Sequence, residues 1–280
     1  MRKALFLNLK DSFSLYAIVE SKTFKPTLED WSEDLLDSIC DYSLIVLYQE
    51  NIDNDLIKKI RIKIAFRNIK LMVFSNSITL EAKKSSLRSG ADFVELLPLS
   101  DEELVDYLSN AKSLLDNSNF YNMDILNPFI LSVQEILSMM AMLELEIVDT
   151  YLSTTPFHYA DISGIMALAG EQKGIIMVSF FEHLSNRIIS SIMGLPIEQI
   201  SEDEQHDGVG ELVNMIAGGA KARLGDSDWN FLLSAPTVIT GNQHRVIQQK
   251  DVPCVVIVLS VDGENFAIQI CLNLLSHNDN

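Results

Sequence analysis

The sequence predicts an α/β protein with two domains, a doubly wound parallel sheet followed by an α/β sandwich with a mainly antiparallel sheet. The chain has 280 residues, 48% of them hydrophobic, which is enough to build two cores. Its first part alternates short apolar runs with helical stretches, a pattern typical of a parallel sheet covered by helices. Its last two apolar runs are joined by Asp262-Gly263, a hairpin signal that indicates antiparallel strands.

The first domain is predicted over residues 1–117. Its strands are short apolar runs, and its helices carry apolar residues at spacings of three and four. We expect strands at 3–9, 44–48, 70–75 and 93–96, a less defined strand near 16–20 or 23, and helices at 55–66, 80–89 and 101–115.

The second domain is predicted over residues 126–280, after a short polar linker at 118–125. Asn127-Pro128 combines a helix cap with a proline at the first helical position, so a helix is expected from there to about 142. Further along the chain, the apolar pattern predicts strands at 144–154, 160–170, 174–181, 229–234, 238–243, 254–261 and 266–272, and helices at 182–193 and 202–224.

The charge is distributed unevenly along the chain. The net charge is -18, and residues 1–120 hold 15 basic and 19 acidic side chains against 6 and 20 in the remainder. The first part is therefore near neutral and the second is strongly acidic. Because an acidic surface repels phosphate backbones, nucleic acid is not expected to bind the second part.

Cysteine usage and hydropathy predict the cellular compartment and the redox state of the protein. Cys40, Cys254 and Cys271 are odd in number and lack metal-ligand spacing, and the chain starts directly with a strand pattern rather than a cleavable leader. No apolar run is long enough to cross a bilayer. We therefore expect a reduced, cytoplasmic protein without a membrane partner.

The most informative segment runs from residue 207 to residue 219. Glu211 and Asn214 are three positions apart and Asp207 lies four before Glu211, so the three side chains line one stripe of a helix. The opposite side is apolar and is formed by Val209, Leu212, Val213 and Ile216. A helix docked through that apolar side would present a carboxylate and a carboxamide to solvent or to a partner.

Two other kinds of site, a metal site and a phosphate-binding loop, can be tested on residues of this segment. His206 stands beside Asp207, but we identify no second metal ligand at helical spacing from it. Gly218 and Gly219 would let the helix pack closely on the sheet. A phosphate-binding loop is not indicated, because no lysine follows these glycines at the required spacing.

Together these residues resemble the signature of the CheC/CheX/FliY phosphatase family. That signature is an Asp or Ser, three residues, Glu, two residues, Asn, and then a Pro after a spacer of about twenty-two residues. Here 21 residues separate Asn214 from Pro236, one fewer than in the family pattern. The order of elements resembles the CheX type, with a single signature helix. CheC-type chains carry two, and the other candidate helix has Ser185 where an Asn would be needed.

The first domain resembles a response-regulator receiver in its last strand and loop, from Gly90 to Leu99. Receivers need an acidic pair after the first strand, an Asp that ends the third strand and a Lys before the Pro. This chain has Asn8, Tyr48 and Leu97 at the corresponding places, and only Ser75 matches the family's Thr or Ser. Without two hard oxygen ligands Mg²⁺ would bind poorly. We interpret the domain as a degenerate receiver kept for docking or dimerisation.

The resemblance implies hydrolysis of the aspartyl phosphate on a separate, phosphorylated CheY-like receiver, which would supply its own Mg²⁺. Asn214 would orient the attacking water and Glu211 would meet the receiver's active-site Lys. Asp207 and Pro236 would support the site, and the chain would need no cofactor of its own. The family also implies a homodimer, with the C-terminal strands as the expected seam.

Two other hypotheses concern the same residues. One is a non-catalytic dimeric adaptor or scaffold in two-component or chemotaxis signalling. The retention of Glu211 and Asn214 on one helix face argues against it, since a pure scaffold does not need them. The other hypothesis makes the first domain the target in cis, and it fails because Tyr48 offers no carboxylate.

Overall fold

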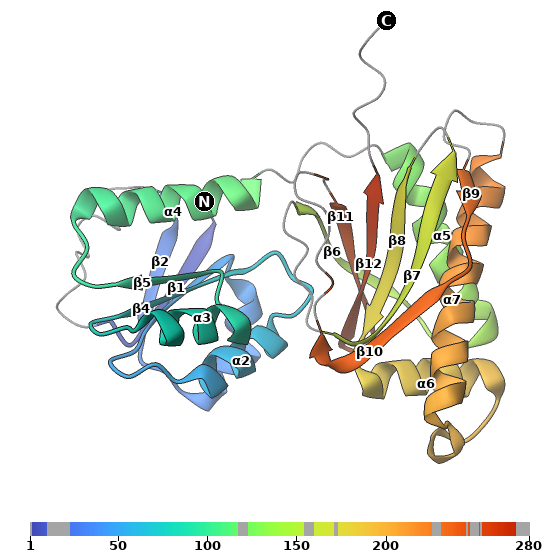
Figure 1. Cartoon of the computed structure of the whole chain (residues 1–280), viewed down its shortest axis with the longest axis horizontal. Coiled ribbons are helices and arrows are strands. Elements are labelled where there is room, and N and C mark those ends of the chain that lie inside the picture. The colour runs from blue at the N-terminus through green and yellow to red at the C-terminus, as the bar shows by residue number, and fades with distance from the viewer. Residues whose placement is uncertain are drawn as a thin grey trace, which may run out of the picture. The chain divides into compact units, whose positions relative to one another are not determined.

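The computed structural model of the chain forms two compact units, Met1–Asn117 and Ser118–Asn280 (Figure 1). The structure describes residues 2–9, 23–116, 123–153, 160–170, 173–225, 231–244, 246, 252 and 254–272. Within these ranges no helix is long and apolar enough to cross a membrane.

The first unit is built on a five-stranded parallel sheet with the order β2-β1-β3-β4-β5. Apolar clusters cover both faces, as expected for a parallel sheet whose crossover segments pack on either side. This is the receiver-like doubly wound sheet that the sequence predicts, and that prediction is confirmed. The elements are β1 Lys3–Leu7, β2 Lys25–Glu29, 3₁₀ turns at Glu33–Asp37 and Ile39–Asp41, β3 Leu44–Tyr48, α2 Asn54–Lys63, β4 Lys70–Ser75, α3 Leu80–Ser89, β5 Phe93–Leu96 and α4 Asp101–Asp116.

One strand of this sheet was not among the predicted strands. The strand expected near 16–20 falls outside the described residues, and the strand beside β1 is β2, which begins at Lys25. Pro26 lies within β2, where the missing N–H is tolerated because β2 is an edge strand. That proline lowers the strand signal of residues 25–29 in the sequence, so this strand was not predicted.

The second unit is a mainly antiparallel sheet with the order β10-β7-β8-β12-β11-β6, and β9 pairs with β7. Helices α5, α6 and α7 pack on one face of it and share one apolar cluster with the strands, which confirms the predicted α/β sandwich (Figure 1). The elements are α5 Met123–Met140, β6 Glu146–Ser153, β7 Ala160–Gly170, β8 Gly174–Phe180, α6 Glu182–Met193, a 3₁₀ turn at Ile197–Gln199, α7 Glu202–Leu224, β9 Phe231–Leu233, β10 Thr237–His244, β11 Cys254–Val261 and β12 Glu264–Leu272.

Helix α5 begins earlier than predicted. It starts at Met123, so Asn127 is not its cap and Pro128 lies inside the helix. Burial explains the difference, because Ile125 and Leu126 are 3% and 2% exposed in the core and have to be helical to reach it together. The linker expected at 118–125 therefore overlaps the first turn of this helix.

The position of the C-terminal strands changes the expected dimer seam. β11 pairs with β12 and β6, and β12 pairs with β11 and β8, so both strands lie inside the sheet. The outer strands of the described sheet are β6 and β10. An edge-to-edge seam through the last two strands is therefore not available, and a continuous sheet between two copies would have to use β6 or β10.

Two of the three cysteines are joined in the structure. Cys254 and Cys271 face each other across β11 and β12 and form a disulfide, while Cys40 is free. The expectation that all three are reduced is wrong for this pair. Their separation of 17 residues gave no signal, because only the pairing of the two strands brings the sulfur atoms together.

Candidate functional site

Helix α7 carries the signature residues and has strong local start and stop signals. The hydroxyl of Ser201 accepts a hydrogen bond from the backbone N–H of Glu204, whose carboxylate accepts one from the backbone N–H of Ser201 at 2.7 Å, forming a capping box. Gly225 follows the last helical residue with φ +54°. The helix therefore has defined ends, which fixes the position of the residues between them.

The face that α7 buries is the apolar face predicted from the sequence. Val209, Leu212, Val213 and Ile216 are at most 1% exposed and belong to the core of the unit. On the other side Asp207 and Glu211 are exposed and Asn214 is half-buried. Packing of the apolar stripe thus holds the carboxylate and the amide at the surface.

The acid and the amide lie next to each other on this surface. Nδ2 of Asn214 donates to Oε2 of Glu211 over 3.5 Å, a long and weak bond at an exposed position. Among the described residues no donor bonds to Oδ1 of Asn214. An amide held from one side in this way presents its oxygen to an incoming water molecule.

Pro236 lies beside the signature helix although it is distant in the sequence. It follows β9, and a Cβ placed on Gly210 would lie 3.8 Å from Cγ of Pro236 and 3.5 Å from Cγ2 of Val238. Pro236 therefore packs against the turn of α7 that carries Glu211. Asp207 is not part of the helix cap, because Ser201 and Glu204 form it.

Helix α7 approaches both α5 and the sheet closely at glycine residues. A Cβ on Gly219 would lie 2.1 Å from Oγ of Ser132 on α5, and one on Gly218 would meet nothing within 4 Å. The contact with the sheet is made at Gly164 of β7, where a Cβ would lie 3.0 Å from the carbonyl oxygen of Val209. The expectation that Gly218 and Gly219 pack on the sheet is therefore wrong, since Gly219 packs on α5.

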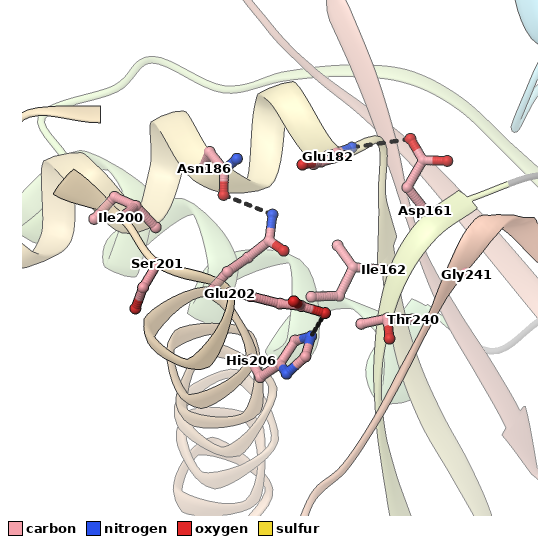
Figure 2. A pocket seen from close by; sticks show the side chains of 11 residues that line it. Asp161, Ile162, Glu182, Asn186, Ile200, Ser201, Glu202, His206, Thr240 and Gly241 are labelled. Atoms are coloured by element: carbon pink, nitrogen blue, oxygen red, sulfur yellow. Dashed lines mark hydrogen bonds and ion pairs between the residues drawn. The ribbon is translucent and has the colours of Figure 1, made fainter. Parts of the chain in front are cut away.

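A cavity of about 500 Å³ opens at the start of α7 (Figure 2). Asp161, Glu182 and Glu202 are among its lining residues, and the Asp161 carboxylate accepts a hydrogen bond from the backbone N–H of Glu182 at 3.1 Å. The lining residues come from α6, α7, β7, β10 and the turn before α7, so no spacing in the sequence indicates this cavity. Asp207, Glu211, Asn214 and Pro236 do not line it.

His206 points into this cavity and has a neighbour that the sequence analysis missed. Its Nε2 lies 3.9 Å from Oε1 of Glu202, which is four residues earlier and thus at helical spacing. Nε2 of His206 is buried and has no hydrogen-bond partner among the residues that the structure describes. Two side chains do not make a metal site, and the described residues contain no group of three or more potential His, Cys, Asp or Glu ligands.

The capping box gives a testable consequence for stability. We expect Ser201→Ala to destabilise the second unit by about 1 kcal/mol, because it removes the acceptor at the start of α7. The hydrogen bonds from the backbone and side chain of Ser201 lower the pKa of Glu204 below its ordinary value. The contribution of Glu204 is therefore present above the ordinary carboxyl pKa and is lost as the pH falls through the lowered value.

Urea denaturation followed by circular dichroism at neutral and at acid pH would measure both effects. The control is Ser138→Ala on the exposed face of α5, which should change the midpoint little. A Ser201→Ala midpoint equal to that of the wild type at neutral pH would contradict the assignment of the cap.

Comparison with known proteins identifies the family to which the second unit is similar. The model of the chemotaxis phosphatase CheX family matches residues 162–260, which include Asp207, Glu211, Asn214 and Pro236. A CheC-like superfamily protein from Shewanella sp. PV-4 is 32% identical, with 54% of this chain and 99% of that chain covered and a TM-score of 0.51. This chain belongs to the CheX-type chemotaxis phosphatase family.

Other solved structures are similar over the same part of the chain. The chemotaxis protein CheX from Vibrio vulnificus is 29% identical, with 53% of this chain and 99% of that chain covered and a TM-score of 0.49. CheX in a CheX–CheY–BeF₃–Mg²⁺ complex from Borrelia burgdorferi is 22% identical, with 54% and 99% covered and a TM-score of 0.45. No curated protein matches the chain.

The first unit has the receiver-like fold. At the strand ends where a receiver holds its phosphoryl group, this unit has side chains that are buried or hydrogen-bonded within the protein. Tyr48 ends β3, is 2% exposed and accepts a hydrogen bond from Nδ2 of Asn76 at 2.9 Å. Ser75 ends β4, is fully buried, and its Oγ lies 3.2 Å and 3.0 Å from the carbonyl oxygens of Glu50 and Ser77. A phenol and a satisfied hydroxyl thus occupy the end of the two central strands.

The remaining two receiver positions are likewise used for structure. Asn8 follows β1 at φ +57°, a conformation that Asn tolerates, and its Oδ1 accepts from the backbone N–H of Trp31 at 2.7 Å. Leu97 follows β5, is 4% exposed and packs in the same apolar cluster as Phe74 and Leu104. Neither position offers a charge to a phosphoryl group.

Proposed function

We propose that this protein hydrolyses the aspartyl phosphate of a separate, phosphorylated CheY-like receiver, with Asn214 orienting the attacking water. The observation that carries the proposal is the pair of exposed Glu211 and half-buried Asn214 on one face of α7, inside the segment that matches the chemotaxis phosphatase model. A rigid helix with a capped start is a suitable support for such a pair, because catalytic positioning depends on a fixed geometry.

The substrate would bring most of the catalytic machinery. A phosphorylated receiver holds its own Mg²⁺, Lys and Thr or Ser against the phosphoryl oxygens, so the chain needs no cofactor. The missing component is a water held in line with the bond that breaks. A carboxamide accepts a hydrogen bond from water through its oxygen and needs no proton exchange, and Oδ1 of Asn214 would accept it while Nδ2 bonds to Glu211.

Glu211 would fix the orientation of the complex. It is exposed one turn before Asn214, where it can meet the active-site Lys of the receiver. An ion pair at an exposed rim contributes more to orientation and association rate than to affinity. Asp207 and Pro236 would support the site, Asp207 as an acid one turn earlier and Pro236 by packing against the turn of Gly210.

The receiver-like unit would act as a docking or dimerisation module. Tyr48 provides no carboxylate that could be phosphorylated, so the substrate has to be another molecule. We propose a cytoplasmic homodimer that binds neither nucleic acid nor a membrane, with β6 or β10 as the seam if the sheets join. Sedimentation at micromolar concentration would test this, and a monomer would exclude it.

The direct test is phosphate release from a purified phosphorylated receiver. We expect the wild-type chain to accelerate release well above the receiver's spontaneous rate, with turnover of many receivers per chain. Binding of a BeF₃-loaded receiver without any acceleration would instead support the non-catalytic adaptor. Receivers from the same organism can be loaded with BeF₃, which mimics the phosphoryl group. The receiver that binds the chain in this form would be identified as the substrate.

Removing the charge of Glu211 should separate docking from catalysis. We expect Glu211→Gln to raise KM about threefold to tenfold with a smaller change in kcat, because it removes a rim charge and keeps the side-chain shape. Glu202→Gln, on the same helix but outside the signature, is the matched control. A drop in kcat at unchanged KM would show that Glu211 acts in the chemical step instead.

A further inference from the structure

Helix α7 contains a glycine that no contact within the described residues requires. A Cβ on Gly208 would lie 2.7 Å from the side chain of Ile189, so this glycine is needed for packing. The same holds for Gly219, whose Cβ would lie 2.1 Å from Oγ of Ser132. A Cβ on Gly218 would meet no described atom within 4 Å, and Gly218 has helical backbone conformation. Neither packing nor backbone conformation therefore explains the glycine at position 218.

This glycine weakens the helix that carries it. Glycine in a helix interior is destabilising relative to alanine, because its backbone loses more conformational freedom on folding. Position 218 lies more than one turn from either end of α7, so it belongs to the interior. It is also partly exposed at the surface. The space left by the missing side chain is therefore available to a molecule that docks on this side of α7.

Gly218 continues the stripe of α7 that carries the signature residues. Successive members of the stripe are four, three, four and three positions apart, which places them on one side of the helix: Asp207, Glu211, Asn214, Gly218 and Lys221. The stripe thus has carboxylates at one end and an ammonium at the other. Lys221 is not a member of any ion pair among the described residues, so its charge is available to a partner.

The order of charges along this stripe is complementary to the site of an aspartyl phosphate. The receiver's Lys would lie toward Glu211, as proposed above. The phosphoryl group is anionic, and the carboxylates of Asp207 and Glu211 would repel it, so it has to lie toward the other end of the stripe. That end has no side chain at Gly218 and a positive charge at Lys221.

The short side chain of Asn214 requires the receiver to come close to the helix. One methylene separates the carboxamide from the backbone, so Oδ1 can hold a water in line only if the phosphoryl-bearing loops approach α7 closely. Gly218 lies about 6 Å further along the helix axis, at a rise of 1.5 Å for each of four residues. A side chain at position 218 would project beside Asn214 and would hold these loops away.

We propose that Gly218 and Lys221 form the second half of the receiver-docking surface on α7. Gly218 lets the phosphoryl-bearing loops approach the helix backbone, and Lys221 meets the anionic side of the phosphoryl site. The inference rests on the proposed function, from which it takes its partner, a phosphorylated CheY-like receiver. Both are positioning residues, because they determine where the receiver lies over Asn214 and take no part in the chemical step.

Substitutions of Gly218 separate docking from stability. We expect Gly218→Ala to raise the urea midpoint of unfolding, since alanine favours the helix and fits without a clash. The same variant should bind a BeF₃-loaded receiver about threefold to tenfold more weakly. Gly218→Leu should lower kcat/KM for phosphate release about a hundredfold, the effect of a displacement of about 1 Å at a reacting centre. Ser138→Leu, which adds the same side chain to an exposed position of α5, is the matched control and should leave binding unchanged.

Lys221→Gln tests the charged end of the surface. We expect association with the BeF₃-loaded receiver to become about threefold to tenfold slower at low salt, and the difference from the wild type to shrink as salt screens the charge. Lys173→Gln removes an exposed lysine outside α7 and is the matched control. Equal association rates for Lys221→Gln and the wild type at low salt would overturn the role of Lys221.

Binding and phosphate release together distinguish this inference from the proposed function. If the wild type releases phosphate rapidly and Gly218→Leu binds and releases equally well, the docking surface is wrong and the proposed function stands. If the wild type binds the BeF₃-loaded receiver without accelerating release, and Gly218→Leu loses this binding, the docking surface holds and catalysis is excluded. A wild-type chain that does not bind the receiver would overturn both. Circular dichroism would verify that each variant is folded.

Discussion

Asn214→Ala is expected to lower kcat for phosphate release from a phosphorylated receiver about a hundredfold, with little change in KM. A hundredfold loss corresponds to about 2.7 kcal/mol of transition-state stabilisation, which one well-placed hydrogen bond to water can provide. Asn214 sits on a capped helix, and among the described residues its amide is hydrogen-bonded only to Glu211, so alanine would remove the proposed water contact without disturbing the core. The effect should therefore appear in kcat.

A conservative replacement sharpens this prediction. Asn214→Gln keeps the amide but moves it by one methylene, so an intermediate loss of about tenfold is expected if position matters. Asn110→Ala, which removes an exposed amide from α4 in the receiver-like unit, is the control. Equal rates for the wild type and Asn214→Ala would remove the catalytic role and leave the adaptor hypothesis.

Arg61→Ala is expected to destabilise the receiver-like unit by about 3–5 kcal/mol, the usual cost of breaking a buried ion pair. The Arg61 side chain is 6% exposed, its Nη2 lies 2.5 Å from Oδ2 of Asp92, and its Nε donates to the carbonyl oxygen of Gly90 at 2.7 Å. Oδ2 of Asp92 also accepts from the backbone N–H of Leu71 at 2.7 Å. Alanine would leave a mostly buried carboxylate without its cation between β4 and β5.

An exposed pair provides the control for this prediction. Lys59 and Glu33 form an ion pair with side chains 49% and 65% exposed, so Lys59→Ala should cost less than about 1 kcal/mol. Chemical denaturation monitored by circular dichroism and native-state hydrogen exchange would measure both variants. A loss of similar size in Arg61→Ala and Lys59→Ala would show that the buried pair is not a main support of this unit.

Local sequence patterns were sufficient for most elements. The predicted strands at 44–48, 70–75 and 93–96 and the helices at 80–89, 182–193 and 202–224 match β3, β4, β5, α3, α6 and α7. In α7 the apolar period, the capping residues and the final glycine all agree, so its boundaries were determined locally. In α5 they disagree, since Asn127-Pro128 resembles a helix start and burial of the preceding turn decides the outcome.

Features that combine residues from distant segments could be identified only from the folded structure. Pairing of β11 with β12 brings Cys254 to Cys271, and the cavity at the start of α7 combines residues from five parts of the chain. Sequence spacing carries no information about such contacts, because they depend on which strands become neighbours.

The sequence by itself determined that Glu211 and Asn214 share one exposed helix face, because the helical period is a local property of the chain and the apolar residues between them have to be buried. It also determined that position 48 cannot form an aspartyl phosphate, because tyrosine has no carboxylate. Only the tertiary structure decided that Pro236 packs beside Gly210 and that α5 and α7 meet at Ser132 and Gly219. Those contacts arise from strand order and helix crossing, which are set by the packing of the whole unit.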